Sequence, residues 1–191
     1  MDNDRPPLAR IIKEELIDYR IRSRFYHPAY VRTLALSGNE KVLEFGSGGG
    51  CLSRALARTL SPEGSLSCVD LSAYWIHKAQ ERLKNLASIE FLQGDITRME
   101  LPENHFDAIL IHFALHDVAP AERVDVMNAL ATCLRPEGMV FIREPAKPDH
   151  GLPLSEIRTL MQGAGLREMQ SGCFKSWQWK QICNGTFKKS W

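Results

Sequence analysis

A short apolar run that passes directly into a cluster of glycines constrains the fold of this chain more than any other feature. Val42-Leu43-Glu44-Phe45 is typical of a buried strand, and Gly46-Ser47-Gly48-Gly49-Gly50 follows it without a spacer. Glycine accepts positive φ and lets a ligand approach the backbone closely. A strand, a glycine-rich turn and a helix in this order predict a nucleotide-binding turn at the carboxyl end of the first strand. A tight turn that binds nothing is the alternative.

From Lys41 onward, strand-like and helix-like segments alternate. This alternation predicts an α/β fold in which helices cover both faces of a mostly parallel sheet. Two later strand-like segments have no helix between them, so we expect an antiparallel pair at one edge. The expected strands are 42–45, 65–69, 89–92, 106–111, 139–143, 166–174 and 179–187, and the expected helices are 52–60, 73–86, 121–134 and 154–162.

Acidic residues follow the second and third expected strands. Asp70 comes directly after strand 65–69, where a carboxylate can accept hydrogen bonds from both hydroxyls of a ribose. It can instead cap the next helix, although Ser72 is a second candidate for that role. Asp95, in Gly94-Asp95-Ile96, can accept a hydrogen bond from an adenine amine or simply form an Asx-turn. The carboxyl ends of neighbouring parallel strands are where such sheets bind ligands.

These features together resemble the class I S-adenosylmethionine-dependent methyltransferases. Glu44–Gly50 matches the E/D-x-G-x-G-x-G motif of that family, and Leu101–Asp107 and Leu134–Met139 resemble its approaches to strands 4 and 5. The resemblance is nearest to the small-molecule branch related to ubiquinone/menaquinone-biosynthesis methyltransferases. It implies a doubly wound (Rossmann-like) seven-stranded sheet in the order 3-2-1-4-5-7-6, with strand 7 antiparallel. It also implies S-adenosylmethionine as cofactor, S-adenosylhomocysteine as product, and a cofactor site made of Glu44, Gly46, Ser47, Gly48, Gly50, Asp70, Leu71, Gly94, Asp95, Ile96 and His112.

Two histidines follow the fourth expected strand, where the resemblance places the methyl group. His112 is expected to line the methionine part of the cofactor, and His112 or His116 is a candidate general base. The alternative is that His116-Asp117 only caps the following segment. Methyl transfer from a sulfonium is an in-line displacement, so positioning and exclusion of water can supply most of the rate without any acid or base. No metal is expected to take part.

The N-terminal region is expected to form a lid. Apolar residues at helical spacing predict an amphipathic helix over 7–21, and Pro28 is expected to open a second helix that ends near Ser37-Gly38. We therefore expect a single domain over 1–191, with a helical lid at 1–37 and a cofactor-binding α/β core at 38–191. Aromatic residues of the lid can favour a sulfonium or a flat substrate, or can simply pack on the core; they are Tyr19, Phe25, Tyr26 and Tyr30.

Charge, hydropathy and cysteine content exclude several other classes of protein. The net charge of +1 argues against a nucleic-acid partner, and no run approaches the roughly 20 apolar residues that span a bilayer. The polar start suggests a cytoplasmic protein. Cys51 stands where a dinucleotide fingerprint needs glycine or alanine, which argues against an oxidoreductase. The five widely spaced cysteines argue against a disulfide framework or a zinc site.

Some assignments stay open at this point. The acceptor is expected to be a small molecule, and the alternative is a non-catalytic S-adenosylmethionine-binding sensor or a partner-dependent subunit. Glu144 and His150 belong to a short connecting segment and can reach a substrate or serve only the loop. A tryptophan cluster near the C-terminus can pack the edge strands, form a homodimer contact or wall a substrate; it comprises Trp177, Trp179 and Trp191.

Overall fold

The strands form a seven-stranded sheet in the order β3-β2-β1-β4-β5-β7-β6, as expected. The fold comes from a computed structural model, which describes residues 6–13, 19, 23–86, 88–146, 151–176 and 180–190. The chain divides into two compact units, Met1–Asp95 and Ile96–Trp191. The assignment of the whole chain to one domain therefore stays a prediction, and the two units are described in turn.

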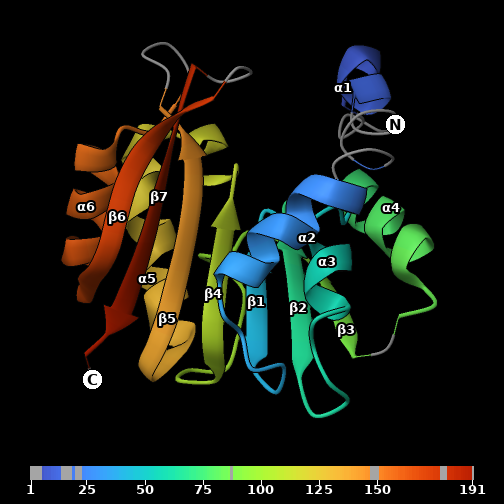
Figure 1. Ribbon diagram of the computed structural model, residues 1–191, viewed down its shortest axis with the longest axis horizontal. Helices are drawn as coiled ribbons and strands as arrows, with labels where there is room; N and C mark the ends of the chain where they lie inside the picture. Colours follow the sequence, from blue (N-terminus) through green and yellow to red (C-terminus); the bar gives the residue numbers. More distant parts are fainter. Residues whose placement is uncertain are drawn as a thin grey trace. The chain divides into compact units, whose positions relative to one another are not determined.

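The first unit holds three parallel strands and the helices between them (Figure 1). The strands are β1 (Lys41–Phe45), β2 (Ser65–Asp70) and β3 (Ile89–Gln93), and the helices are α3 (Ser53–Ala57) and α4 (Ala73–Leu83). β1 and β2 are buried over most of their length, which fits strands covered on both faces. α4 buries one face at helical spacing, made of Trp75, Ile76, Ala79 and Leu83. This core holds the carboxyl ends of β1 and β2 in register.

The N-terminal helices differ in part from the expectation. α1 covers Leu8–Lys13, and residues 14–18 and 20–22 of the expected first helix lie outside the described residues. α2 runs from Ser23 to Thr33, so Pro28 lies inside this helix and does not open it. A proline in a helix interior loses one backbone hydrogen bond. Burial of Tyr30 and Val31, which are 6% and 1% exposed, offsets that cost here.

The second unit holds the other four strands, with two helices on one face. The strands are β4 (Phe106–His112), β5 (Leu134–Pro145), β6 (Leu166–Ser176) and β7 (Lys180–Lys189). The helices are α5 (Arg123–Cys133) and α6 (Leu154–Gly163), preceded by the short 3-10 turns η2 (Leu115–Asp117) and η3 (Pro120–Glu122). Arg123 of α5 pairs with Glu156 of α6 at 2.6 Å. β4 and β5 are parallel, whereas β7 runs antiparallel to β5 and β6, as expected.

β5 begins earlier than the sequence suggests. The segment Arg135-Pro136-Glu137-Gly138 was expected to be a turn before a strand at 139–143, but the strand starts at Leu134. The pairing with β4 shifts register between Phe106 and Ala108, so the extra residues form a bulge. Glu137 takes a positive φ of 65° in this bulge.

The expectation that the cysteines form no disulfide is wrong for one pair. Cys173 of β6 and Cys183 of β7 are opposite each other in the hairpin and form a disulfide. They are ten positions apart in sequence, but antiparallel pairing places them side by side. The other three cysteines are not disulfide-bonded and are buried, as small apolar residues are expected to be; they are Cys51, Cys68 and Cys133.

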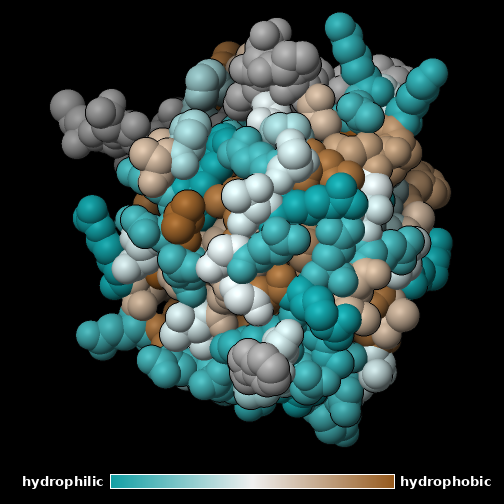
Figure 2. All heavy atoms as spheres, turned by 90° about the vertical axis from the view of Figure 1, so that its left-hand side faces the viewer, coloured by the Kyte–Doolittle hydropathy of each residue, from teal (hydrophilic) through white to brown (hydrophobic). Residues whose placement is uncertain are grey.

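β6 forms one edge of the sheet. Its residues are mostly exposed after Leu166, and the surface of this side of the molecule is largely hydrophilic (Figure 2). Polar and charged side chains on an edge strand oppose edge-to-edge pairing with other chains. Among the described residues, no helix has both the length and the apolar character needed to cross a membrane.

Candidate functional site

The glycine turn after β1 is fastened to the end of β2. Gly46 N and Ser47 N both donate to the carbonyl oxygen of Val69, at 2.8 and 3.0 Å. Gly46, Gly48 and Gly50 have φ values of 69°, 51° and 80°. L-residues with a Cβ rarely adopt these values, so glycine is needed at each of the three positions. The turn therefore has the conformation that the glycine pattern predicts.

Asp70, at the end of β2, is oriented by two backbone donors. Gly48 N donates to Oδ2 at 2.8 Å, and Ser72 N donates to Oδ1 at 2.9 Å. Ser72 is the N-cap of α4, and its Oγ accepts from Trp75 N, so Ser72 and not Asp70 caps this helix. A carboxylate oxygen has a second lone pair, so Asp70 keeps acceptor capacity for ligand hydroxyls. The geometry fits the ribose-binding role, which stays a prediction.

Hydrogen bonds join the end of β3 to the end of β2. Gly94 N donates to the carbonyl oxygen of Asp70 at 3.1 Å, and Gln93 Nε2 donates to that of Leu71 at 3.0 Å. The Leu71 side chain is 68% exposed, whereas Asp95 is half-buried. Hydrogen bonds thus connect the glycine turn to the end of β2, and the end of β2 to the end of β3. An exposed apolar side chain beside oriented polar groups suits the flat face of a base.

Two features of the glycine turn fit a ligand held against the backbone. Ser47 Oγ is buried, and it has no hydrogen-bond partner among the described residues. Such an atom costs free energy unless a ligand or water satisfies it. A Cβ placed on Gly48 meets no atom within 4 Å, so the space beside this residue is open. The turn therefore has a hydroxyl without a partner among the described residues and open space beside the backbone, as a ligand-binding turn would.

Glu44 lies in β1, just before the turn, and Ser53 of α3 contacts its side chain. Its side chain is 2% exposed, and Ser53 Oγ donates to its Oε2 at 2.5 Å. Burial raises the pKa of Glu44 to about 8, the charge of Asp70 also raises it, and the Ser53 hydrogen bond lowers it. Glu44 is therefore mostly protonated near neutral pH. The structure supports a role in holding the turn, while direct contact with the cofactor stays a prediction.

Arg82 of α4 supports the turn from the other side, and the sequence did not reveal this. Its Nη1 donates to the carbonyl oxygen of Gly49 at 2.7 Å. Its guanidinium lies 4.1 Å from the ring centroid of Tyr19, and that of Arg54 lies 5.5 Å from the same ring. Tyr19 belongs to the expected lid, and these cation–π contacts connect it to the turn.

His112, the first of the two candidate bases, is the last residue of β4. His112 is paired with Arg143 of β5, and its ring contacts that of Phe113 at 4.4 Å between centroids. Phe113 has a positive φ of 56°, and its N–H donates to the carbonyl oxygen of Arg143 at 2.9 Å. Strained backbone of this kind is often found at functional sites. Ile96, at the start of the same unit, is buried at 5% exposure.

His116, the second candidate base, is held by a buried carboxylate. Its Nδ1 lies 2.6 Å from Oε2 of Glu144, and its Nε2 lies 3.5 Å from Oδ1 of Asp117. Oε1 of Glu144 accepts from Ala114 N and Leu115 N, at 3.0 and 2.7 Å. Glu144 is completely buried within β5, and through these contacts it anchors the loop, which supports the loop role. His150, Trp177, Trp179 and Trp191 lie outside the described residues.

We predict that alanine at two glycines of the turn has unequal effects on stability. Gly50→Ala is expected to lower the free energy of unfolding by about 2–4 kcal/mol, because the cost of the positive φ and the cost of overpacking add together. Its Cβ meets Leu83 Cδ1 at 2.9 Å and Ala79 Cβ at 3.2 Å. Gly48→Ala is expected to lower the free energy of unfolding by about 1–2 kcal/mol, because it has only the cost of the positive φ. Urea denaturation measures both, and equal losses would contradict the packing argument.

Comparison with known proteins agrees with this geometry. A family model described as a methyltransferase domain matches residues 42–138, which is just over half of the chain. The chain belongs to the class I S-adenosylmethionine-dependent methyltransferases. The ubiquinone/menaquinone biosynthesis C-methyltransferase UbiE of Pseudomonas savastanoi pv. phaseolicola is 31% identical over 119 residues, 61% of this chain and 45% of that protein. The chain thus spans about half the length of the curated relatives that it matches.

Solved methyltransferase structures share the fold. A S-adenosylmethionine-dependent methyltransferase from Aquifex aeolicus superposes with a TM-score of 0.76 at 19% identity, over 97% of this chain and 100% of that chain. The N-methyltransferase NodS from Bradyrhizobium japonicum, solved with S-adenosylhomocysteine, gives 0.73 at 19% identity, over 92% and 90%. At this identity the likeness concerns the fold. The expected strand order of the methyltransferase is therefore confirmed both by its topology and by its neighbours.

Proposed function

We propose that this methyltransferase binds S-adenosylmethionine at the glycine turn and transfers its methyl group to a small-molecule acceptor. The observation that carries the proposal is the Asp70 carboxylate, which Gly48 N and Ser72 N orient at the end of β2. Two fixed donors hold this side chain before any ligand arrives. A preoriented acceptor loses little side-chain entropy when a ribose binds.

The chain's own residues position the donor and exclude water. Bound S-adenosylmethionine supplies an electrophilic methyl group on a sulfonium. Ser47 Oγ and the backbone of the turn are expected to hold the methionine end, Asp70 the ribose, and Leu71 with Asp95 and Ile96 the adenine. Transfer is then an in-line displacement, for which alignment and desolvation supply most of the rate.

His116 is the better-supported candidate where the acceptor needs a general base. If Nδ1 donates to Glu144, the neutral ring leaves Nε2 able to accept a proton. A carboxylate that fixes the tautomer of a histidine is the arrangement found in catalytic triads. His112, at the end of β4, is then expected to line the methyl group instead.

The acceptor is proposed to be a small molecule and not a nucleic acid. The curated relative from Pseudomonas savastanoi is named as a C-methyltransferase of ubiquinone/menaquinone biosynthesis, which supports a small organic acceptor. The connection between β5 and α6 is short, at residues 146–153, and this length supports a small acceptor. A near-neutral net charge also does not favour a polyanion. We also propose a cytoplasmic location and a homodimer.

Calorimetric titration with S-adenosylmethionine and S-adenosylhomocysteine tests the cofactor site. We expect Asp70→Ala to weaken binding by about 1.5–3 kcal/mol, the scale for a lost hydrogen-bond partner of a charged group. Asp70→Asn keeps the shape and one acceptor oxygen, so it should lose less. Folded wild-type protein that binds neither ligand would contradict the proposal.

Turnover separates an enzyme from a sensor. Release of S-adenosylhomocysteine in the presence of a panel of small acceptors is expected for an enzyme. Tight binding of the cofactor with no turnover on the panel would instead favour a non-catalytic binding protein.

A further inference from the structure

Arg123 is the first residue of α5, and its guanidinium reaches back to the loop that carries His116. Its Nε donates to the carbonyl oxygen of Val118 at 3.0 Å, and its Nη2 donates to that of His116 at 3.2 Å. Its Nη1 donates to Oε1 of Glu156 in α6 at 2.6 Å. Arg123 is buried, at 7% exposure. Each nitrogen of the guanidinium thus has an acceptor in this unit, and two of the acceptors belong to one loop.

The two carbonyl groups lie in and directly after a short turn. His116 is the middle residue of η2, a 3-10 turn of three residues, and Val118 follows the turn. Carbonyl groups at the C-terminal end of a helical turn have no partner within that turn. A single 3-10 turn also has poorer hydrogen-bond geometry than an α-helix. The donors of Arg123 therefore hold the C-terminal side of a turn that is weak by itself.

Glu144 of β5 holds the opposite side of the same turn. Its Oε1 accepts from Ala114 N and Leu115 N, and its Oε2 lies 2.6 Å from Nδ1 of His116. The turn therefore lies between a carboxylate that binds its N–H groups and a guanidinium that binds its C=O groups. This arrangement matches the polarity of a helical turn. His116 is held by both groups, through its ring at Glu144 and through its backbone at Arg123.

Glu156 sets the direction in which the guanidinium points. A guanidinium presents its donors in a rigid planar fork, so the bond from Nη1 to Glu156 fixes the plane in which Nε and Nη2 meet the loop. A lysine can pair with Glu156, but it has no such fork with which to reach both carbonyl oxygens. The carboxylate also supplies the counter-charge that a buried arginine needs. The pair is therefore a specific device and not an ion pair on the surface.

We propose that Arg123 is a positioning residue for His116, because it fixes the turn on which the imidazole meets Glu144. The inference rests on the proposed function, in which His116 is the candidate general base. In that step the proton of the acceptor passes to Nε2, the attacking atom bonds the methyl group, and the sulfur keeps the electron pair of the broken S–C bond. Nε2 can take this proton only while Nδ1 carries the proton that it donates to Glu144.

Loss of the Arg123 contacts has a defined consequence for the imidazole. The turn becomes free to shift, and the ring of His116 can then move away from the Glu144 carboxylate. A neutral imidazole without a fixed partner divides between its Nδ1–H and Nε2–H tautomers. Arg123 thus acts on the reaction only through the tautomer and the place of His116.

NMR of the His116 imidazole nitrogens tests the proposal. Long-range proton–nitrogen spectra of protein with isotope-labelled histidine distinguish the two tautomers, and the signal that His116→Gln loses identifies His116. We expect wild type with bound S-adenosylhomocysteine to show mainly the Nδ1–H form when the ring is neutral. Arg123→Lys should lower the ratio of Nδ1–H to Nε2–H by about three- to tenfold, the scale of one lost hydrogen bond.

Variants of Glu156 give an independent measurement in case Arg123→Lys does not fold. Glu156→Ala removes the carboxylate that directs the guanidinium, so the tautomer ratio should change in the same direction. Glu156→Gln keeps an oxygen that accepts from Nη1, so the ratio should return to within about twofold of wild type. Urea denaturation shows which variants are folded under the conditions of the NMR measurement.

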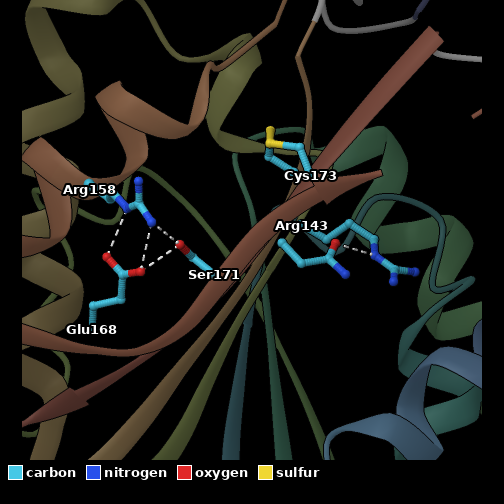
Figure 3. Close-up of a disulfide and its surroundings, with 7 residues drawn as sticks. Arg143, Arg158, Glu168, Ser171 and Cys173 are labelled. Carbon is cyan, nitrogen blue, oxygen red and sulfur yellow. Dashed lines mark hydrogen bonds and ion pairs between the residues drawn. A yellow bond between two sulfur atoms is a disulfide. The ribbon is translucent and has the colours of Figure 1, made fainter. Parts of the chain in front are cut away.

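Arg158→Lys is the matched control. Arg158, also of α6-borne ion pairs the more exposed one, donates to Glu168 at 2.8 and 3.0 Å and to Ser171 at 2.9 Å, as Figure 3 shows. Both partners belong to β6 and not to the His116 loop. The tautomer ratio of Arg158→Lys should therefore equal that of wild type.

The outcomes separate positioning from general stabilisation. An unchanged ratio in folded Arg123→Lys or Glu156→Ala, or a wild type with mainly Nε2–H, would overturn the proposal. An equal change in Arg158→Lys would also overturn it, since the loss of any arginine pair would then move the ring.

Turnover gives a second readout on any acceptor of the panel that the wild type methylates. Arg123→Lys should lower kcat about tenfold and leave KM within about twofold, as for a base that is misplaced and not removed. An unchanged kcat would count against the proposal. Failure of the proposed function is seen separately, as wild type that binds no S-adenosylhomocysteine.

Discussion

Glu144→Ala is expected to lower the free energy of unfolding by about 3–5 kcal/mol, the scale for breaking a buried charged network. The Glu144 carboxylate is completely buried and receives Ala114 N, Leu115 N and His116 Nδ1. Alanine leaves these donors without their acceptor, and each unsatisfied buried donor costs free energy. The free energy of unfolding of a typical domain is only about 5–15 kcal/mol, so Glu144→Ala should remove a large part of the stability.

Glu144→Gln is the matched control. Its amide oxygen can still accept from Ala114 N and Leu115 N, so the expected loss is about 1–2 kcal/mol. Urea denaturation with an unchanged m-value measures both variants. A loss below about 1 kcal/mol in Glu144→Ala would show that water or another acceptor replaces the carboxylate. If His116 acts as a base, Glu144→Gln should also reduce turnover in excess of its small effect on stability.

The fold was predictable because its strands carry strong local signals. Val42–Phe45 and Phe106–Ile111 are nearly continuous apolar runs, and each is found inside a buried strand. The conformation of the glycine turn was predictable for a similar reason, since three positive φ values need the glycines that the sequence shows. The strand order was available only through the resemblance, because periodicity does not tell which strands are neighbours.

The partners of the site residues were not predictable from the sequence. Glu144 lies 28 residues from His116, and only the parallel pairing of β4 with β5 brings their ends together. Ser53 beneath Glu44 and Arg82 beside Gly49 depend in the same way on how helices pack. The disulfide was missed because Cys173 and Cys183 meet only through the hairpin register. In each case the sequence names the residue types, while tertiary packing decides the pairs.

The disulfide also bears on the expected cytoplasmic location. Disulfides are rare in the reducing cytosol and common in oxidising compartments. A cytoplasmic methyltransferase of this sequence is therefore expected to hold the β6–β7 cross-link only in part or under oxidising conditions. The thiols are well placed to form it, because Cys173 and Cys183 are opposite each other in the hairpin. Mass spectrometry after rapid alkylation of cell extracts measures the oxidised fraction directly.

The stability of the protein should fall as the pH rises from about 4.5 to about 8 because of Glu44. Its pKa in the folded state is about 8, mainly through burial, against 4.5 for an ordinary glutamate. Across this window the folded state binds more protons than the unfolded state, so unfolding becomes easier as protons are removed. The contribution is complete below pH 4.5 and is lost by about pH 8, with a slope of up to about 1.4 kcal/mol per pH unit.

Glu44→Gln isolates this contribution. Glutamine keeps the carbonyl oxygen that accepts from Ser53 Oγ but has no proton to lose, so the pH slope due to Glu44 should vanish. Glu63→Gln is the control: its hydrogen bond from Ser61 lowers the pKa of this exposed carboxyl, so it titrates below the window. Urea denaturation at pH 5, 6, 7 and 8 compares the three proteins. Identical slopes in wild type and Glu44→Gln would mean that Glu44 is already ionised at pH 5. The glycine turn would then rest on a buried charge and not on a neutral hydrogen-bonded acid.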